Sequence, residues 1–402
     1  MTSLDDDPAY AGLKVLDLSQ GVAGPHCGML LARHGADVVK LEPLDGDWGR
    51  AIGQRYGDQC AYSLAFNRGK KSLALDLKAP AGTDIAMRLA EEADVILQNY
   101  RPGVIERLGL DHARVTQTNP SVVYLSLTGF GQKGPSASLP ATDSVMQAYS
   151  GLMAINRDGE GLPQRIGILA IDIMTGLYAF QAIAPALYRR AAKGLGAHIE
   201  TSLMEAVGAF QSAKMIEHAL GGGGDQRLGV PVAMFEAEDG YININGRRDN
   251  HFAALCEVLG LPELASDPRF ATVPARYENE AVLMGMLREA VRNWTVADIA
   301  AALNAADVLN APVHDYGDYF EAPQVKETEA VSWLEVAGIG RLPFPRLPGF
   351  GPAQADDPRY LTPHIGEHSA EVLGGLGYSK DQIRALAVDG AIGLGAREAG
   401  AG

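Results

Sequence analysis

The first part of the chain alternates short apolar segments with helical patterns, and this alternation restricts the fold more than any other feature. Residues 13–18 alternate apolar and polar side chains and lead into a loop of small residues, which is typical of a strand. Residues 26–34 favour a helix that ends at Gly35, and residues 37–42 favour a second strand. This order predicts a βαβ unit of ordinary size.

Later segments extend the same pattern. Residues 73–77, 94–99, 121–127 and 198–203 favour strands, and residues 80–92 and 104–114 favour helices. Because the carboxyl ends of parallel strands meet at one edge of a sheet, we expect Lys78, Asn99 and Arg101 at one ligand-binding crevice. The stretch 21–24 lacks the three glycines of a dinucleotide fingerprint, so NAD is not expected there.

Charge limits the possible partners. The 402 residues carry a net charge of −15, so nucleic acid and anionic membranes are not expected as partners. A ligand that bears phosphates therefore needs a local basic site. Arg68, Lys70 and Lys71 lie within four residues, and they either anchor such a phosphate or form a solvated basic turn.

Cysteine usage and the N-terminus indicate the cellular compartment. Cys27, Cys60 and Cys256 have no metal-like spacing and are expected as buried small residues, which suits a reducing cytoplasm. The acidic N-terminus lacks the order of a signal peptide, and no uncharged apolar run reaches membrane-spanning length. We expect a soluble, cytoplasmic protein without a metal site or a permanently bound cofactor.

One carboxylate, Asp172, lies in an otherwise apolar stretch, residues 163–176. Burial raises the pKa of such a group unless partners compensate. The residues after it favour a helix, so Asp172 is either a helix cap or a catalytic group. Asp143 stands at the start of another predicted helix, and the same reasoning makes it a cap.

Four consecutive glycines, residues 221–224, indicate a hinge and a domain boundary, since glycine has the greatest backbone freedom. The pattern beyond them changes to a hairpin at 233–245, helices over 250–308, a second hairpin at 331–346 and a final helix pair near 367–375 and 379–387. The chain is accordingly divided into a first part, 1–220, a small inserted domain, 225–330, and a returning part, 331–402.

Six segments, taken in order, resemble the class III CoA-transferases, the CaiB/BaiF family that includes formyl-CoA transferase. They are residues 13–18 with 23–25, 35–42, 67–72, 99–103, 129–135 and 365–369. Each is a weak signal alone, but their order and spacing over nearly the whole chain are specific. The resemblance implies an α/β fold with a Rossmann-like large domain formed by both chain ends. It also implies a smaller inserted α+β domain and an interlocked homodimer.

The resemblance further implies an active site. An aspartate of the family attacks the acyl-CoA carbonyl, and Asp172 stands at the matching motif. Asp143 stands where some members carry an acidic residue that positions the reacting groups. The positions implied to bind coenzyme A, which is a substrate here, are Val22, Ala23, Leu75, Asp76, Leu77, Lys78, Asn99, Tyr100, Arg101 and Arg107.

Two positions depart from the family pattern. Several members have an arginine for the CoA phosphates where this chain has Pro43, so that contact is missing or is supplied by Arg50, Arg68 or Lys70. Racemases of the family carry a histidine where this chain has Thr142. Proton transfer at Cα needs that histidine as one of two opposed acid–base groups, which makes a racemase the weaker interpretation.

The expected reaction moves CoA from a donor acyl-CoA to a carboxylic acid through an aspartyl-CoA thioester, with amides of the glycine loops 129–134 and 221–224 as candidate oxyanion donors. Succinyl-CoA or another short dicarboxylyl-CoA is the preferred donor. The alternatives are an α-methylacyl-CoA racemase, an intramolecular transfer within one dicarboxylyl-CoA, and a non-catalytic acyl-CoA-binding protein. The candidate cations for a second substrate carboxylate are His26, Arg55, Arg165, Arg247 and Arg248.

Overall fold

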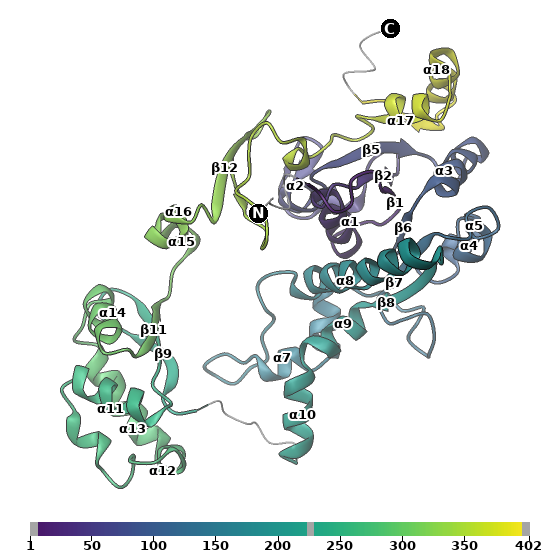
Figure 1. Ribbon diagram of the computed structural model, residues 1–402. Helices are drawn as coiled ribbons and strands as arrows, with labels where there is room; N and C mark the ends of the chain where they lie inside the picture. The colour runs from purple at the N-terminus through teal and green to yellow at the C-terminus, as the bar shows by residue number, and fades with distance from the viewer. Residues whose placement is uncertain (1–6, 223–228, 396–402) are drawn as a thin grey trace. The chain divides into compact units, whose positions relative to one another are not determined.

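The computed structural model describes residues 7–222 and 229–395, which divide into two compact units (Figure 1). The large unit comprises the described residues up to Ala213 and from Glu329 onward. The small unit comprises the described residues from Lys214 to Thr328. The predicted hinge at 221–224 and the two ends of the chain lie partly outside the described residues.

Within the described residues, the large unit is built on a seven-stranded sheet with the order β14-β5-β2-β1-β6-β7-β8. Six of these strands are parallel, and β14 pairs antiparallel with β5. The strands are β1 (Lys14–Asp17), β2 (Asp37–Glu42), β5 (Lys70–Leu75), β6 (Val95–Gln98), β7 (Val123–Thr128), β8 (Ala197–Ser202) and β14 (Ile392–Gly393). The predicted α/β class with a parallel sheet is therefore confirmed.

The chain builds this sheet outward from its middle in two directions. Strands β2 and β5 follow β1 on one side, and β6, β7 and β8 follow on the other, so the direction reverses between β1 and β6. Open α/β sheets bind ligands outside the carboxyl ends of the strands at such a reversal. Strand β14 pairs with β5, and α17 (Ser369–Gly375) packs on β5 (Figure 1). These C-terminal elements therefore belong to the large unit.

Helices cover both faces of the sheet because successive strand residues point to opposite faces. Leu16 and Ile96 face a core shared with α3 (Pro80–Glu92), whereas Val15 and Leu97 face a core shared with α1 (Ala23–Arg33) and α8 (Ala170–Lys193). The other helices of the large unit include α2 (Ala61–Phe66), α4 (Val104–Arg107), α5 (His112–Val115), α6 (Asp143–Tyr149), α7 (Leu152–Ile155), α9 (Leu203–Phe210), α18 (Lys380–Val388) and the 3₁₀ turns η1 (Trp48–Ala51) and η3 (Pro358–Tyr360).

Several predicted boundaries differ from the structure. Helix α1 begins at Ala23 rather than at residue 26, because the first turn tolerates Pro25, whose missing N–H has no helical partner there. Strand β5 begins at Lys70, so part of the predicted basic turn is a buried strand. The single helix predicted over 104–114 is two short helices, α4 and α5, separated by Gly109 at φ +69°. Strand β14 was not predicted, since two residues carry no periodicity.

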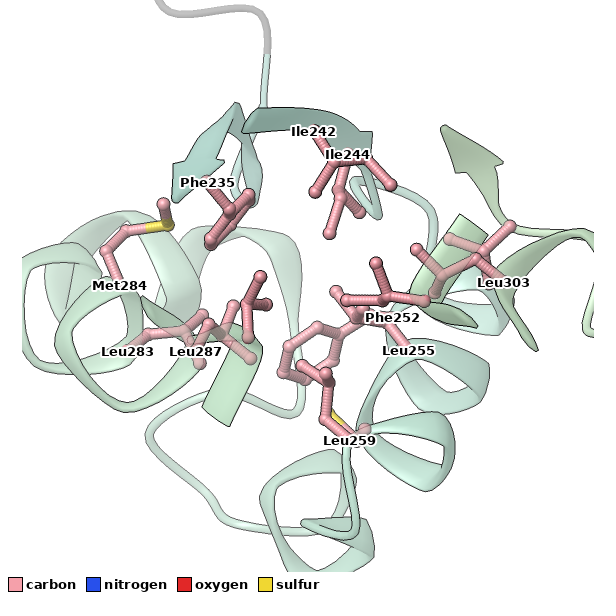
Figure 2. Packing of buried hydrophobic residues seen from close by; sticks show 14 of the residues in the cluster. Phe235, Ile242, Ile244, Phe252, Leu255, Leu259, Leu283, Met284, Leu287 and Leu303 are labelled. Carbon is pink, nitrogen blue, oxygen red and sulfur yellow. The ribbon is translucent and has the colours of Figure 1, made fainter. Parts of the chain in front are cut away.

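The small unit packs helices against a three-stranded antiparallel sheet with the order β11-β10-β9. Phe235, Ile242 and Ile244 point from the sheet toward Phe252 and Leu287 on the helices (Figure 2), which forms a separate hydrophobic core. The elements are β9 (Val232–Glu236), β10 (Tyr241–Asn245), β11 (Leu309–Pro312), α11 (Asp249–Val258), η2 (Pro262–Ala265), α12 (Val273–Glu278), α13 (Glu280–Val291), α14 (Val296–Ala305), α15 (Tyr316–Glu321) and α16 (Pro323–Glu327). Helix α10 (Ser212–Leu220) crosses the boundary between the two units.

Both predicted hairpins are confirmed. Strands β9 and β10 pair antiparallel, as do β12 (Val331–Val336) and β13 (Gly340–Pro345). The three cysteines are buried and unpaired, as expected. Among the described residues one helix, α8, is long and apolar enough to cross a membrane by length and composition alone; that is weak evidence, because core helices of soluble proteins pass the same test. Helix α8 packs on α1, α9, β7 and β8.

Candidate active site

A cavity of about 420 Å³ opens at the reversal between β1 and β6, within the large unit. Its walls come from the residues after β1, β2, β6 and β7 and from the starts of α8 and α9. Of the predicted site residues, those that line it are Val22, Ala23, Asn99, Tyr100, Arg101 and Asp172. Those that do not line it are Leu75, Asp76, Leu77, Lys78, Arg107 and Asp143. For these, a role in CoA binding stays a prediction.

Asp172 is the third residue of α8, and Leu169 occupies the N-cap position. The hypothesis that Asp172 caps its own helix is therefore wrong. No described residue donates a hydrogen bond to its carboxylate, which lines the cavity. Burial and, to a smaller extent, the negative charge of Asp143 raise the pKa of Asp172 to about 7. The result is a weakly solvated carboxylate that faces an open space.

Asp143 is buried at the first position of α6, and its carboxylate contacts the start of α8. Its Oδ2 accepts hydrogen bonds from the amides of Ile171 at 2.7 Å and Asp172 at 3.3 Å, while its Oδ1 accepts one from Gln147 Nε2. Asp143 thus caps the N-terminus of α8, not that of its own helix as predicted. It holds the backbone of Asp172 in place and at the same time opposes ionisation of the Asp172 side chain.

The start of α1 presents backbone donors to the same cavity. The described residues supply no side-chain cap to this helix and no backbone acceptor to the amides of Val22, Ala23 and Gly24. The first amides of a helix carry a partial positive charge and suit a developing oxyanion. Gly129, from the predicted glycine loop at 129–134, also lines the cavity.

Helices α1 and α8 cross closely enough to place these donors near Asp172. A Cβ on Gly176 would lie 2.7 Å from the Ala23 carbonyl oxygen and 2.8 Å from His26 Cβ, so glycine is required at the crossing. His26 Nδ1 lies 3.0 Å from the carbonyl oxygen of Ile173, one residue after Asp172. Burial lowers the pKa of His26 to about 4, so the imidazole is neutral near pH 7. The hypothesis that His26 supplies a cation is therefore wrong.

The cations proposed to replace an arginine at Pro43 are engaged elsewhere. Arg50 forms two hydrogen bonds with the buried carboxylate of Glu42, at 2.7 and 2.8 Å. Arg68 is buried over aromatic rings, and Lys70 Nζ lies 2.8 Å from Asp17 Oδ2 in the interior. None of these cations lines the cavity, and a role for them at the CoA phosphates stays a prediction. The alternative of a solvated basic turn is wrong for Arg68 and Lys70, which are buried.

Few side chains in the described part of this cavity could supply a positive charge to a substrate carboxylate. Arg101 is the one lysine or arginine among its described lining residues, and no histidine lines it. Arg55 and Arg165 are exposed and do not line it, and Arg247 and Arg248 belong to the small unit.

Two further lining residues, Gln20 and Trp48, were missed by sequence reasoning. Gln20 donates its backbone amide to Asn99 Oδ1 at 2.8 Å, which ties the loop after β1 to the loop after β6. Trp48 follows β2, which ends at the same sheet edge as β5 and β6. The strand order could have indicated Trp48, since β2 is a neighbour of β1, where the order of the strands reverses.

Comparison with known proteins decides the family. The model of CoA-transferase family III matches residues 10–369. The chain belongs to this family.

Characterised relatives within family III are similar over most of their length. The chain is 32% identical to a succinate–glutarate CoA-transferase of Agrobacterium fabrum, over 92% of this chain and 96% of that protein. It is 36% identical to an acetyl-CoA:oxalate CoA-transferase of Acetobacter aceti, over 83% of this chain and 87% of that protein. A crystal structure of a CAIB/BAIF family protein from Brucella suis matches with a TM-score of 0.80 and 33% identity, over 91% of this chain and 98% of that one. The resemblance to the class III CoA-transferases is confirmed.

Proposed function

We propose that this family III protein is an acyl-CoA:carboxylate CoA-transferase whose nucleophile is Asp172. The observation that carries the proposal is the state of the Asp172 carboxylate: it lines the cavity, accepts no hydrogen bond from the described residues and lies near the free amides at the start of α1. Poor solvation makes a carboxylate a better nucleophile, and the amides suit the oxyanion that forms when it attacks a thioester.

The reaction proceeds by four exchanges at acyl carbonyls. Asp172 attacks the donor thioester, the C–S bond breaks, and a mixed anhydride and CoA thiolate form. The thiolate attacks the aspartyl carbonyl, which releases the donor acid and leaves an aspartyl-CoA thioester. The acceptor carboxylate attacks that thioester and frees the thiolate again. The thiolate then attacks the acceptor's own carbonyl in the second anhydride, which yields the new acyl-CoA and restores Asp172.

The substrates are proposed as short dicarboxylic acids. Relatives carry the names succinate–glutarate and succinyl-CoA:glutarate CoA-transferase, which supports succinyl-CoA as donor and a C5 acid as acceptor. An intramolecular transfer within one dicarboxylyl-CoA uses the same chemistry. Exposed Lys78 and Arg107 follow β5 and β6 at the sheet edge and, with Arg101, are the candidates for the CoA phosphates. The buried thiols of the three cysteines suit a cytoplasmic enzyme.

A racemase is disfavoured by the described cavity. Racemisation at Cα requires two opposed acid–base groups, and the lining residues offer Asp172 without a histidine. Thr142, which lines the cavity where a racemase would carry histidine, does not ionise near neutral pH.

We also propose that the large and small units are two domains and that two chains interlock as a homodimer. Large apolar side chains on α8, α9 and α10 support a partner surface: Tyr188 is 77% exposed, Phe210 53% and Leu220 84%. Light scattering after size exclusion should give twice the mass of one chain; the mass of a single chain would contradict the dimer.

The test of the function is covalent trapping. Purified protein is incubated with a panel of acyl-CoAs that includes succinyl-CoA, then treated with hydroxylamine and mapped by mass spectrometry. We expect a hydroxamate on Asp172, and Asp172→Ala should lose both this adduct and transfer activity, the latter by at least about 10³-fold. Asp381→Ala removes an exposed carboxylate of α18 and should change neither. Deuterium exchange at Cα of a 2-methylacyl-CoA without any adduct would instead establish a racemase.

A further inference from the structure

Four charged side chains are fully buried beneath the loop that follows β1. The side chains of Asp17, Lys40, Asp47 and Lys70 have no exposed surface. Lys40 Nζ lies 2.9 Å from Asp47 Oδ2, and Lys70 Nζ lies 2.8 Å from Asp17 Oδ2. Desolvation of each charge is costly, so buried ion pairs are weak contributors to stability. Their other contacts therefore indicate what they do.

These charges hold the backbone of the loop, residue by residue. Asp17 Oδ1 accepts the amide of Ser19 at 3.0 Å, and Lys40 Nζ donates to the carbonyl of Ser19 at 2.8 Å. Asp47 Oδ1 accepts the amide of Gly21 at 2.8 Å. The loop then enters α1 at Val22 and Ala23, whose amides lack a described acceptor. The buried charges thus fix the segment immediately before the proposed oxyanion donors.

Asp47 connects this loop to a second wall of the cavity. The same Oδ1 accepts the amide of Gly49 at 2.8 Å, which fixes the turn that carries Trp48. The indole of Trp48 lies directly against Gly21: a Cβ added there would be 2.3 Å from Trp48 Cζ2. One carboxylate oxygen therefore joins the backbones of two loops that line the cavity from different strands.

We propose that Asp47, with its charge balanced by Lys40, is a positioning residue for the transfer reaction. It sets the position of the α1 amides and of the Trp48 wall relative to Asp172. A rigid donor is needed because oxyanion stabilisation depends on hydrogen-bond geometry. The bonds to Gly21 and Gly49 add to the bonds between Gln20 and Asn99 in fixing this loop. This inference rests on the proposed function.

The chain offers a matched control at another ion pair of the large unit. Asp357 accepts hydrogen bonds from buried Arg33 at 3.1 Å and from the backbone amide of Arg359 at 2.8 Å. Like Asp47, it combines an ion pair with a backbone amide. Neither Asp357 nor Arg33 lines the cavity. Asp357→Ala thus removes an ion pair to a buried arginine without disturbing the loop.

The experiment compares Asp47→Ala, Asp47→Asn and Asp357→Ala in the full-length protein. For each variant, kcat and the KM for acyl-CoA are measured together with the rate of hydroxylamine-trapped adduct and the Tm. Asp47→Ala should lower kcat and the trapping rate by about tenfold or more, with KM changed less than about threefold, since Lys78, Arg101 and Arg107 are untouched. Asp47→Asn keeps an oxygen that accepts the Gly21 amide and should recover most of kcat. Asp357→Ala should lower Tm but leave kcat within about twofold.

Two results would overturn the inference. One is Asp47→Ala with wild-type kcat; the other is an equal fall of kcat in Asp357→Ala, which would make the loss a general effect of destabilisation. If Asp47→Ala does not fold, the double variant Lys40→Met with Asp47→Leu leaves no unpaired buried charge. Its kcat must then fall for the inference to stand, because it lacks the acceptor for the amides of Gly21 and Gly49. Absence of the adduct in the wild-type protein would instead contradict the proposed function.

Discussion

At the scale of single residues, the site is governed by two carboxylates with different environments. Asp143 is buried but receives three hydrogen bonds, from Ile171, Asp172 and Gln147. Asp172 lines the cavity and receives none from the described residues, and burial and the charge of Asp143 raise its pKa to about 7. Environment rather than residue type therefore gives Asp143 a structural role and makes Asp172 the candidate for chemistry.

We predict that transfer depends on pH with a midpoint set by Asp172. Only the ionised carboxylate attacks a thioester, so kcat/KM for acyl-CoA should rise with pH around a midpoint near 7. Asp143→Asn removes the neighbouring negative charge, lowers the pKa of Asp172 and moves the midpoint to lower pH. The ionised fraction at pH 6 should then be larger than in the wild-type protein. The measurement is a pH profile of adduct formation.

Asparagine still offers an oxygen to the amide of Ile171, so the cap of α8 can persist in this variant. Asp143→Ala, which removes the cap, provides the comparison. A midpoint that stays in place or moves to higher pH in Asp143→Asn would contradict the assignment.

At the scale of elements, the geometry of the candidate site depends on how closely two helices approach. Gly176 on α8 lies against the Ala23 carbonyl and His26 of α1, and this crossing brings the start of both helices to one cavity. Neutral His26 joins the helices through the carbonyl of Ile173. The starts of α1 and α8 thus form a single geometric unit.

Gly176→Ala should separate α1 from α8. A methyl group within 2.8 Å of backbone and side-chain atoms forces the helices to move, at a cost of about 1–3 kcal/mol in the free energy of unfolding. Transfer activity should fall as well, because the movement of the two helices separates Ala23 from Asp172. Gly285→Ala in α13 adds a methyl group in open space and should be neutral or stabilising. The free energy of unfolding by chemical denaturation and kcat are measured for both variants. Equal effects of the two substitutions would exclude the helix crossing as the cause.

At the scale of the whole molecule, the small unit has its own core. Its sheet residues Phe235, Ile242 and Ile244 and its helix residues Phe252 and Leu287 are almost fully buried against one another (Figure 2). Fully buried Arg276 donates to the carbonyls of Val230, Phe270 and Arg247, and so links three loop segments of this unit. A unit with its own hydrophobic core is able to fold alone.

We therefore expect the excised segment 229–328 to fold. Circular dichroism and thermal melting should show a helical spectrum and a cooperative transition. Leu287→Ala within this segment should lower its Tm by several degrees, because the side chain is fully buried. A segment that melts without a transition would show that this core depends on the rest of the chain.

Much of the fold was predictable because local patterns decide it. The strand-and-helix order, the two hairpins and the placement of Asp172 at a helix start follow from periodicity and from glycine positions. The contacts that individual side chains make with residues far away in the sequence were not predictable. Asp143 caps a helix that begins 27 residues after it in the sequence, and Arg50, Arg68 and Lys70, which look available in the sequence, are buried.

The sequence by itself determined the family, the α/β class and the candidate nucleophile, since each depends on which residues follow one another. The tertiary structure alone decided which groups meet: that Asp143 opposes ionisation of Asp172, that His26 is neutral, and that Asp47 joins two loops of the cavity. The physical reason is that pKa values and hydrogen-bond partners depend on distance and burial in space, and residues far apart in the chain set both.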